Sequence, residues 1–311
     1  MNTVSLPEMR LGNVGLCLAT TLADTARYKG ATSGYNSPEI AHSVAQGQLA
    51  YYRILEKQGQ VRIISDWESL DAHVEEWKAQ THDDLPVGLI LDMEGADPIM
   101  TPSQVGDWWD QGVRAIIPCH GGLNLYSHGT HSHGGLTPEG RELLGYMDAK
   151  GMVLDVTHFA DEAFWEALDL FEGPVLASHN NCRALVPGDR QFSDDQLQTL
   201  FKRDGVVGVA LDNWMLYPGF VRGRTLNTCA SLEDVVDQID HICGLAGNAR
   251  HAAIGSDLDG GYGREQSPHD LDTIADLQRI PEILVKRGYS TVDTELITHG
   301  NWLRFFHDAW A

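Results

Sequence analysis

Five apolar runs of the sequence end in a residue that can bind a metal or move a proton. These residues are Glu94 (after LILDM), His120 (after AIIPC), His158 (after VLDVT), His179 (after PVLAS) and Asp257 (after AAIGS). One such histidine alone would more commonly be a hydrogen-bonded core residue, but five such residues at the ends of apolar runs indicate a shared site. Two neutral imidazoles and a carboxylate are typical ligands of a divalent metal, with zinc as the first candidate.

Together these five residues could catalyse a hydrolysis. A bound divalent metal lowers the pKa of a water ligand toward neutrality and thereby supplies a nucleophile. Asp257 could accept the water proton and pass it to the leaving group, and His120 could donate a hydrogen bond to the developing oxyanion. The set therefore predicts metal-assisted hydrolysis of an amide or ester bond, and it leaves the substrate open.

The elements that must position these residues alternate along the chain. We expect strands at residues 14–22, 87–93, 115–120, 152–158, 174–179, 206–211 and 251–257. We expect helices at residues 37–57, 66–80, 101–112, 137–150, 160–171, 193–203, 231–246, 270–287 and 291–308. Near-continuous apolar runs suit strands buried on both faces of a parallel sheet, and the alternation predicts an α/β fold. We predict one domain over residues 1–311, a (β/α)8 TIM-type barrel, in which active sites lie at the C-terminal ends of the strands.

The composition excludes several classes of protein. The chain has 311 residues, with 22 Lys and Arg against 44 Asp and Glu and a net charge of −22. Such a surface repels phosphate groups, so we expect no nucleic-acid partner. No apolar run approaches the roughly 20 residues of a membrane-spanning helix. The five cysteines are scattered and form no CxxC pair, which argues against a disulfide framework and predicts a cytoplasmic, reducing location.

Short motifs occur in a fixed order over nearly the whole chain. They are LPEMRLGNVG (6–15), LDMEG (91–95), AIIPCHGGLN (115–124), GLTPEGRELL (135–144), LDVTH (154–158), PVLASHNNCRAL (174–185), GDRQFSDDQL (188–197), IGSDLDG (254–260) and GNWLRFF (300–306). In this order they resemble the motifs of the renal (membrane) dipeptidase family, metallopeptidases of the amidohydrolase superfamily. The resemblance implies a metal-dependent hydrolase that cleaves small dipeptides and that forms a homodimer.

The resemblance also implies roles for individual residues. It makes Glu94, His158 and His179 metal ligands, His120 and Arg190 substrate contacts, and Asp257 and His120 catalytic groups. In the family the arginine holds the terminal carboxylate of the substrate. That role suits Arg190, because a planar guanidinium pairs with a carboxylate through two parallel hydrogen bonds.

One feature of the family has no counterpart in this sequence. The first strand of the family ends in His-x-Asp, which completes a first metal site with the glutamate, and residues 1–12 contain no such motif. The run at 14–22 matches the second strand of the family, so we expect the barrel to lack its first strand. The run at 61–65 falls where the family has no barrel strand, and we leave it out of the barrel. The chain is then either a fragment of an ordinary dipeptidase or a shortened homologue with one metal half-site.

Other functions stay open at this point. The same residues could hydrolyse N-acyl amino acids or lactams, and the missing His-x-Asp would also fit a pseudoenzyme without catalysis. The histidine-rich segment 126–135 (YSHGTHSHGG) could cover the substrate or supply substitute ligands. A glycine-rich loop holds metal ligands poorly, so we favour a solvated polar loop.

Overall fold

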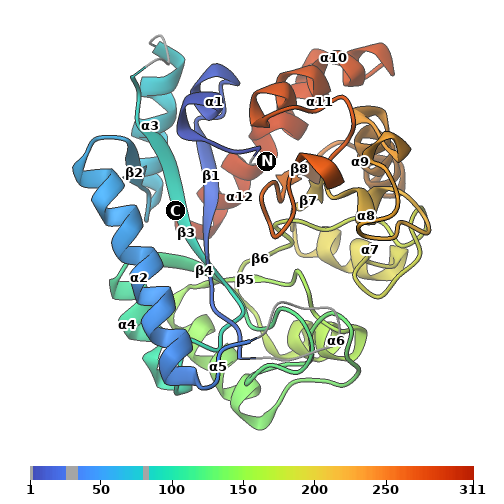
Figure 1. Cartoon of the computed structure of the whole chain (residues 1–311). Helices are drawn as coiled ribbons and strands as arrows, with labels where there is room; N and C mark the ends of the chain where they lie inside the picture. Colours follow the sequence, from blue (N-terminus) through green and yellow to red (C-terminus); the bar gives the residue numbers. More distant parts are fainter. Residues whose placement is uncertain (1–2, 26–33, 80–83) are drawn as a thin grey trace. The chain divides into compact units, whose positions relative to one another are not determined.

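The computed structural model describes residues 3–25, 34–79 and 84–311 (Figure 1). Their contacts divide the chain into two compact units. Unit 1 comprises Met1–Gly15, Ala79–Leu85 and Ala177–Asp308, and unit 2 comprises Leu16–Lys78, Pro86–Leu176 and Ala309–Ala311. Both units combine parallel strands with helices, and the single domain over residues 1–311 stays a prediction.

Unit 2 contains a six-stranded parallel sheet. Its strands are β1 (Leu16–Leu22), β2 (Val61–Ile63), β3 (Val87–Glu94), β4 (Val113–Ile117), β5 (Val153–Asp155) and β6 (Val175–Leu176). They are ordered β1-β3-β4-β5-β6, and β2 pairs with the first residues of β3. Leu22 lies opposite Glu94, which lies opposite Ile117 in the next ladder. This register brings the carboxyl ends of β1, β3 and β4 to one level, where the following residues leave the sheet together.

Among the described residues, unit 2 contains five α-helices, and two of them begin at a capping residue followed by proline. The five helices are α2 (Pro38–Lys57), α3 (Trp67–Ala79), α4 (Val105–Asp110), α5 (Pro138–Lys150) and α6 (Asp161–Leu170). Ser37 and Thr137 accept hydrogen bonds from the first turns of α2 and α5, and each is followed by proline. The helix α2 runs alongside β1 and β2 (Figure 1). Gln80, the last residue of the helix predicted at 66–80, lies outside the described residues.

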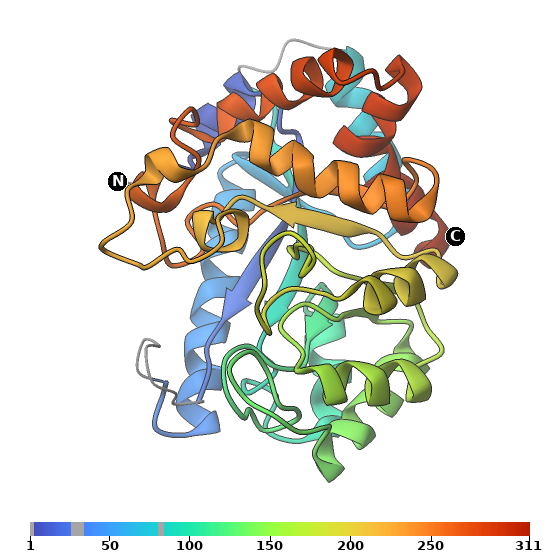
Figure 2. The same cartoon turned by 90° about the vertical axis from the view of Figure 1, so that its right-hand side faces the viewer.

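Unit 1 contains a two-stranded parallel sheet, β7 (Val207–Ala210) and β8 (Ala252–Ser256). Ala177, the residue after β6, forms an isolated parallel bridge with Val207. Its helices are α1 (Leu6–Leu11), α7 (Asp194–Lys202), α8 (Asn213–Leu216), α9 (Leu232–Ala246), α10 (Arg279–Lys286), α11 (Thr291–Glu295) and α12 (Asn301–Trp310). The long helix α9 packs against β7 and β8 (Figure 2). The predicted capping box at the start of α7 is present, with Ser193 and Gln196 bonding each other's backbone N–H.

Short helical turns connect these elements. They are the 3-10 turns η1 (Pro102–Gln104), η2 (Asn227–Cys229), η3 (Arg264–Gln266) and η4 (Ile274–Gln278), and the π-helical turn η5 (Leu296–Gly300). The helix predicted at 291–308 is therefore three successive segments, α11, η5 and α12. The helices α1 and α8 were not predicted, because six and four residues are too few to show a helical repeat.

The run at 61–65, which we left out of the barrel, forms the short strand β2, which pairs with the start of β3 and lies off the path β1-β3-β4-β5-β6. The structure corrects the predicted ends of two other strands. The strands before His120 and His158 end three residues earlier than predicted, because side chains take over the backbone N–H groups there. The His120 N–H donates to Asn124 Oδ1, and the Thr157 N–H donates to Asp155 Oδ1. Among the described residues the ladders run from β1 to β6 and from β7 to β8, and none of them closes a barrel.

Two further findings concern the membrane and the cysteines. Within the described parts of the chain, no helix has both the length and the apolar character that a bilayer-spanning segment requires. All five cysteines are free thiols.

Two glycines of α5 provide a test of the packing in unit 2. A methyl group at Gly140 would overlap the backbone carbonyl of Tyr126, whereas one at Gly145 would meet open space. In a helix interior, alanine normally gives a free energy of folding about 1 kcal/mol more favourable than glycine does. We expect Gly145→Ala to stabilise the protein by about 0.5–1 kcal/mol and Gly140→Ala to destabilise it by about 1–3 kcal/mol. Urea unfolding of both variants measures the difference, and equal stabilities would contradict the close approach.

Candidate functional site

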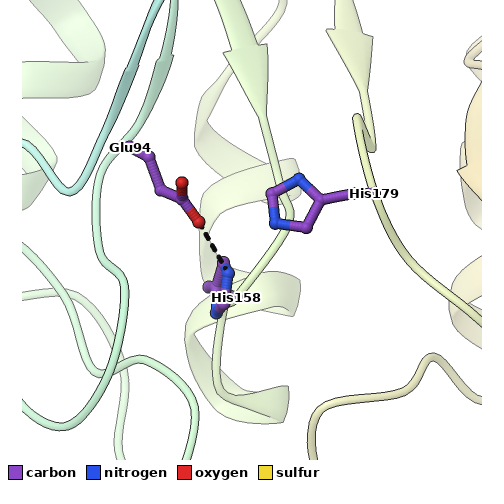
Figure 3. A group of neighbouring side chains, drawn as sticks. All are labelled: Glu94, His158 and His179. Atoms are coloured by element: carbon purple, nitrogen blue, oxygen red, sulfur yellow. Dashed lines mark ion pairs between the residues drawn. The ribbon is translucent and has the colours of Figure 1, made fainter. Parts of the chain in front are cut away.

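Glu94 and His158 form the centre of the candidate site. Glu94 is the last residue of β3, and His158 lies three residues beyond β5. The Nε2 atom of His158 is 2.9 Å from Oε1 of Glu94, and their side chains are only 10% and 12% exposed. Figure 3 shows this ion pair as a dashed line. His158 has a φ of 70°, a left-handed conformation that is uncommon outside glycine and concentrates at functional sites.

His179 completes a group of three possible metal ligands. Glu94, His158 and His179 each offer one ligand atom, and these three atoms lie within 4.8 Å of one another (Figure 3). His179 is buried and follows the bridge between Ala177 and Val207. Two imidazole nitrogens and one carboxylate oxygen are donors that zinc and similar divalent metals accept. The residues present therefore fit a divalent metal.

Hydroxyl groups orient the two imidazoles. The Nδ1 atom of His158 is 3.0 Å from Oγ1 of Thr130, and Nδ1 of His179 is 2.8 Å from Oγ of Ser178. When the Nδ1 atom of a histidine is engaged by a neighbour, Nε2 is the nitrogen presented to a metal. In both histidines the surroundings thus select Nε2 as the ligand atom.

Thr130 belongs to the histidine-rich segment 126–135, and the structure corrects our expectation for it. Ser127 and Thr130 of the segment are buried, and Gly129 forms an isolated antiparallel β-bridge with Phe159. Within the segment, His131 and His133 are the exposed residues. The segment is therefore an ordered support for His158, because its hydrogen bonds are made inside the fold.

We expect Thr130→Val to weaken metal binding by about 10- to 100-fold, the range found when an outer hydrogen-bond partner of a metal ligand is removed. Valine keeps the shape of threonine but cannot bond Nδ1 of His158, so the ring is no longer held. Competition with a chelator measures the dissociation constant of the metal. Thr199→Val, in α7, is the matched control and should leave that constant unchanged.

His120 lies beside the pair of Glu94 and His158. Its Nδ1 atom is 2.6 Å from Oδ2 of Asp24, its Nε2 atom is 3.9 Å from Oε1 of Glu94, and its ring centre is 4.5 Å from that of His158. Burial raises the pKa of Asp24, and the hydrogen bond and charge of His120 oppose that rise. Nε2 of His120 is thus the nitrogen nearest to the candidate ligands.

A second carboxyl group, that of Asp92, lies near Glu94 on the same strand. Asp92 lies two residues earlier on β3 and therefore on the same face. Burial raises the pKa of Asp92 well above its usual range, and the charges of Asp155 and Glu94 raise it further. The neutral acid is favoured there, which reduces the negative charge next to Glu94.

Asp257 follows β8 in a backbone that ordinary residues rarely adopt. Ser256, Asp257 and Asp259 have φ values of 44°, 62° and 63°. Asp259 holds this turn in place by accepting hydrogen bonds from the Thr3 N–H and hydroxyl and the Val4 N–H, at 2.8, 2.9 and 3.0 Å. Left-handed residues persist only where their surroundings determine them, and they concentrate at functional sites.

Arg190 is buried next to His179. Its Nη2 donates to the backbone carbonyl of His179 at 2.8 Å, and its Nη1 donates to the side-chain oxygen of Asn180. These two bonds fix the plane of the guanidinium, as the pairing with a substrate carboxylate requires.

The structure thus groups Glu94, His158 and His120 in unit 2, and His179 and Arg190 in unit 1. Sequence reasoning missed Asp24, Thr130 and Ser178. Asp24 lies two residues beyond β1, so the rule that found the other strand-end residues could also have found it. No signal in the sequence indicates which hydroxyls contact the histidines.

Comparison with known proteins places these residues in a family. A sequence model described as "Membrane dipeptidase (Peptidase family M19)" matches residues 1–310. An uncharacterized dipeptidase of Schizosaccharomyces pombe is 30% identical over 226 residues, which are 70% of this chain and 52% of that protein. The dipeptidase tcpJ of Claviceps purpurea is 30% identical over 204 residues, 63% of this chain and 45% of that protein. The matches therefore span about half the length of these relatives.

Solved structures share the fold. A crystal structure of dipeptidase AC, a family M19 metallopeptidase, matches with a TM-score of 0.86 at 21% identity, over 100% of this chain and 90% of that one. A metallopeptidase of Rhodobacter sphaeroides, liganded with a phosphinate mimic of the dipeptide L-Ala-D-Ala, matches with a TM-score of 0.85 at 20% identity, over 100% and 91%. The predicted α/β class of TIM-barrel type is confirmed by this shared fold. Because the family model covers nearly every residue, the chain belongs to the membrane dipeptidase family, peptidase family M19.

Proposed function

We propose that this chain is a zinc-dependent dipeptidase that hydrolyses small dipeptides. The observation that carries the proposal is the meeting of Glu94, His158 and His179, whose ligand atoms lie within 4.8 Å of one another. Membership of family M19 supports the peptidase activity. The dipeptide mimic bound by the Rhodobacter sphaeroides metallopeptidase supports the substrate class.

Glu94, His158 and His179 would hold the divalent metal, which when bound acts as a Lewis acid and lowers the pKa of water. Zinc is our choice because two imidazoles with one carboxylate form a common catalytic zinc set. The divalent character follows from the metallopeptidase family, whereas the identity of the metal is part of the proposal.

The other residues would act directly on the substrate. Arg190 binds the terminal carboxylate of the dipeptide through parallel N–H donors. His120 donates a hydrogen bond from Nε2 to the carbonyl oxygen as negative charge develops on it. Asp257 accepts a proton from the attacking water and returns it to the leaving amine nitrogen, so that one C–O bond forms as the C–N bond breaks.

A substrate panel tests this assignment. Free dipeptides, N-acetyl dipeptides, N-acyl amino acids and lactams are offered to the metal-loaded protein, and hydrolysis is followed by release of free amino acid. We expect turnover of free dipeptides, with much lower rates after N-acetylation or C-terminal amidation. Faster turnover of N-acyl amino acids or lactams would assign the site to another amidohydrolase reaction.

Elemental analysis of the purified protein gives an independent test. We expect one divalent metal per chain, held by Glu94, His158 and His179. Two metals would show that a further site exists beyond these three residues, and none, together with no turnover, would favour a pseudoenzyme.

The assembly and location of the protein are also proposed. The homodimer rests on the family resemblance, and the cytoplasmic location rests on the five free thiols. Size-exclusion chromatography with light scattering measures the first, and cell fractionation measures the second.

A further inference from the structure

We propose that Asp24 is a positioning residue for His120, selecting the ring orientation and tautomer in which Nε2 faces the site. The inference rests on the proposed function, which assigns oxyanion stabilisation to His120. Its basis is the 2.6 Å contact between Oδ2 of Asp24 and Nδ1 of His120. Asp24 is not part of the motifs that identify the family in this sequence.

The sheet register brings the two residues together. Leu22, Glu94 and Ile117 lie at one level across β1, β3 and β4. Asp24 comes two residues after β1 and His120 three residues after β4. Because β1 and β4 flank β3, the two residues follow the strands on opposite sides of Glu94. All three residues belong to unit 2.

The carboxylate of Asp24 is itself held in place. Asn124 accepts the backbone N–H of His120 at 3.0 Å, and its side-chain amide donates to Oδ1 of Asp24 at 3.4 Å. The same amide donates to Asp97 at 3.2 Å, and Asp97 also accepts from the backbone N–H and the hydroxyl of Thr25, the neighbour of Asp24. Asp24 is therefore fixed relative to the backbone of His120.

Room for this carboxylate depends on the residue after Glu94. Gly95 has a φ of 80°, and a methyl group there would overlap Oδ1 of Asp24. The side chain of Asp24 is 12% exposed and that of His120 is 25% exposed, so water competes poorly for the bond between them.

The chemistry of the pair follows from its donors and acceptors. A carboxylate only accepts hydrogen bonds, so the ring must carry its hydrogen on Nδ1 to make this contact. Nε2 then points away from Asp24 and lies 3.9 Å from Oε1 of Glu94. Without Asp24 the ring could rotate or move its hydrogen to Nε2, and the population of the productive arrangement would fall. A buried carboxylate commonly fixes the tautomer of a catalytic histidine in this way.

The experiment compares two aspartates of the same network. Asp24→Asn changes the group that contacts the ring, and Asp97→Asn changes a buried aspartate that anchors the loops without contacting the ring. The readout is the 15N NMR spectrum of the imidazoles in the metal-free protein, at a pH where they are neutral, with His120→Gln assigning the signal. We expect the Nδ1–H tautomer of His120 in the parent and in Asp97→Asn, and a shift toward Nε2–H in Asp24→Asn.

Kinetics of the metal-loaded protein form the second readout. We expect Asp24→Asn to lower kcat by about 10- to 100-fold with KM within about threefold, which is less than the loss of an oxyanion donor itself. Asp24→Glu, which keeps a carboxylate, should recover part of kcat. Should Asp24→Asn fail to fold, Asp24→Ser removes the carboxylate in a smaller side chain.

The outcomes separate the inference from the proposed function. The same tautomer of His120 in all variants, or an unchanged kcat after the tautomer shifts, would overturn the positioning role. A tautomer shift in a protein that hydrolyses no dipeptide would instead overturn the proposed function and leave the contact between Asp24 and His120 established.

Discussion

Glu94→Gln is expected to lower kcat/KM for dipeptides by at least about 10³-fold, because loss of the metal forfeits several kcal/mol of charge stabilisation. The amide keeps the size of the side chain, but its oxygen carries no charge and is a weaker ligand. Glu94 lies 2.9 Å from His158, so the substitution also removes their ion pair. Steady-state kinetics and elemental analysis should show activity and metal falling together.

The control for Glu94→Gln is Glu76→Gln, the same change at an ion pair with Arg62 on the surface of unit 2. It should retain both metal and turnover. A Glu94→Gln protein that keeps full metal content would remove Glu94 from the ligand set, and one that keeps full turnover would refute the metal-dependent mechanism.

Asp257→Asn should abolish turnover while leaving metal content unchanged. Losing a general base costs about 10²- to 10⁴-fold in rate, and asparagine cannot accept the water proton at neutral pH. The substitution suits the backbone, since Asp257 has a φ of 62° and asparagine tolerates the left-handed region well. The loss of rate is therefore expected without a loss of fold, which thermal unfolding verifies.

Asp204→Asn is a matched control, because Asp204 is exposed and also left-handed, with a φ of 53°. It should leave kcat unchanged. Turnover that survives Asp257→Asn would mean that another group is the base. Loss of metal from Asp257→Asn would instead mean that Asp257 is a ligand.

The sequence predicts where each strand lies to within a few residues, but it does not predict the residue at which each strand ends. Apolar, β-branched runs mark every strand of the path β1-β3-β4-β5-β6 and both strands of unit 1. Where a ladder stops depends on competition for backbone N–H groups. Near His120 and His158 the side chains of Asn124 and Asp155 accept backbone N–H groups that would otherwise continue the ladder. A pattern of apolar residues does not indicate such side-chain hydrogen bonds.

The strand β2 shows that composition can mark a strand without specifying its partner. The run at 61–65 has the composition of a strand, and we left it out of the barrel because the family has no barrel strand at that position; it lies off the path β1-β3-β4-β5-β6. It pairs with Val87–Leu89 at the start of β3. Its pairing partner is set by the tertiary structure, since a three-residue strand has too little pattern to specify one.

The sequence by itself determined the α/β class, the family and the residue types that could bind a metal, because strand-end chemistry and motif order are local properties of the chain. The tertiary structure decided which groups meet. Asp24 and His120 are 96 residues apart in sequence and 2.6 Å apart in space, and Thr130 and Ser178 decide which nitrogen of each histidine is presented. Such contacts depend on strand register and on side-chain packing, which bring distant residues together and leave no periodic trace in the sequence.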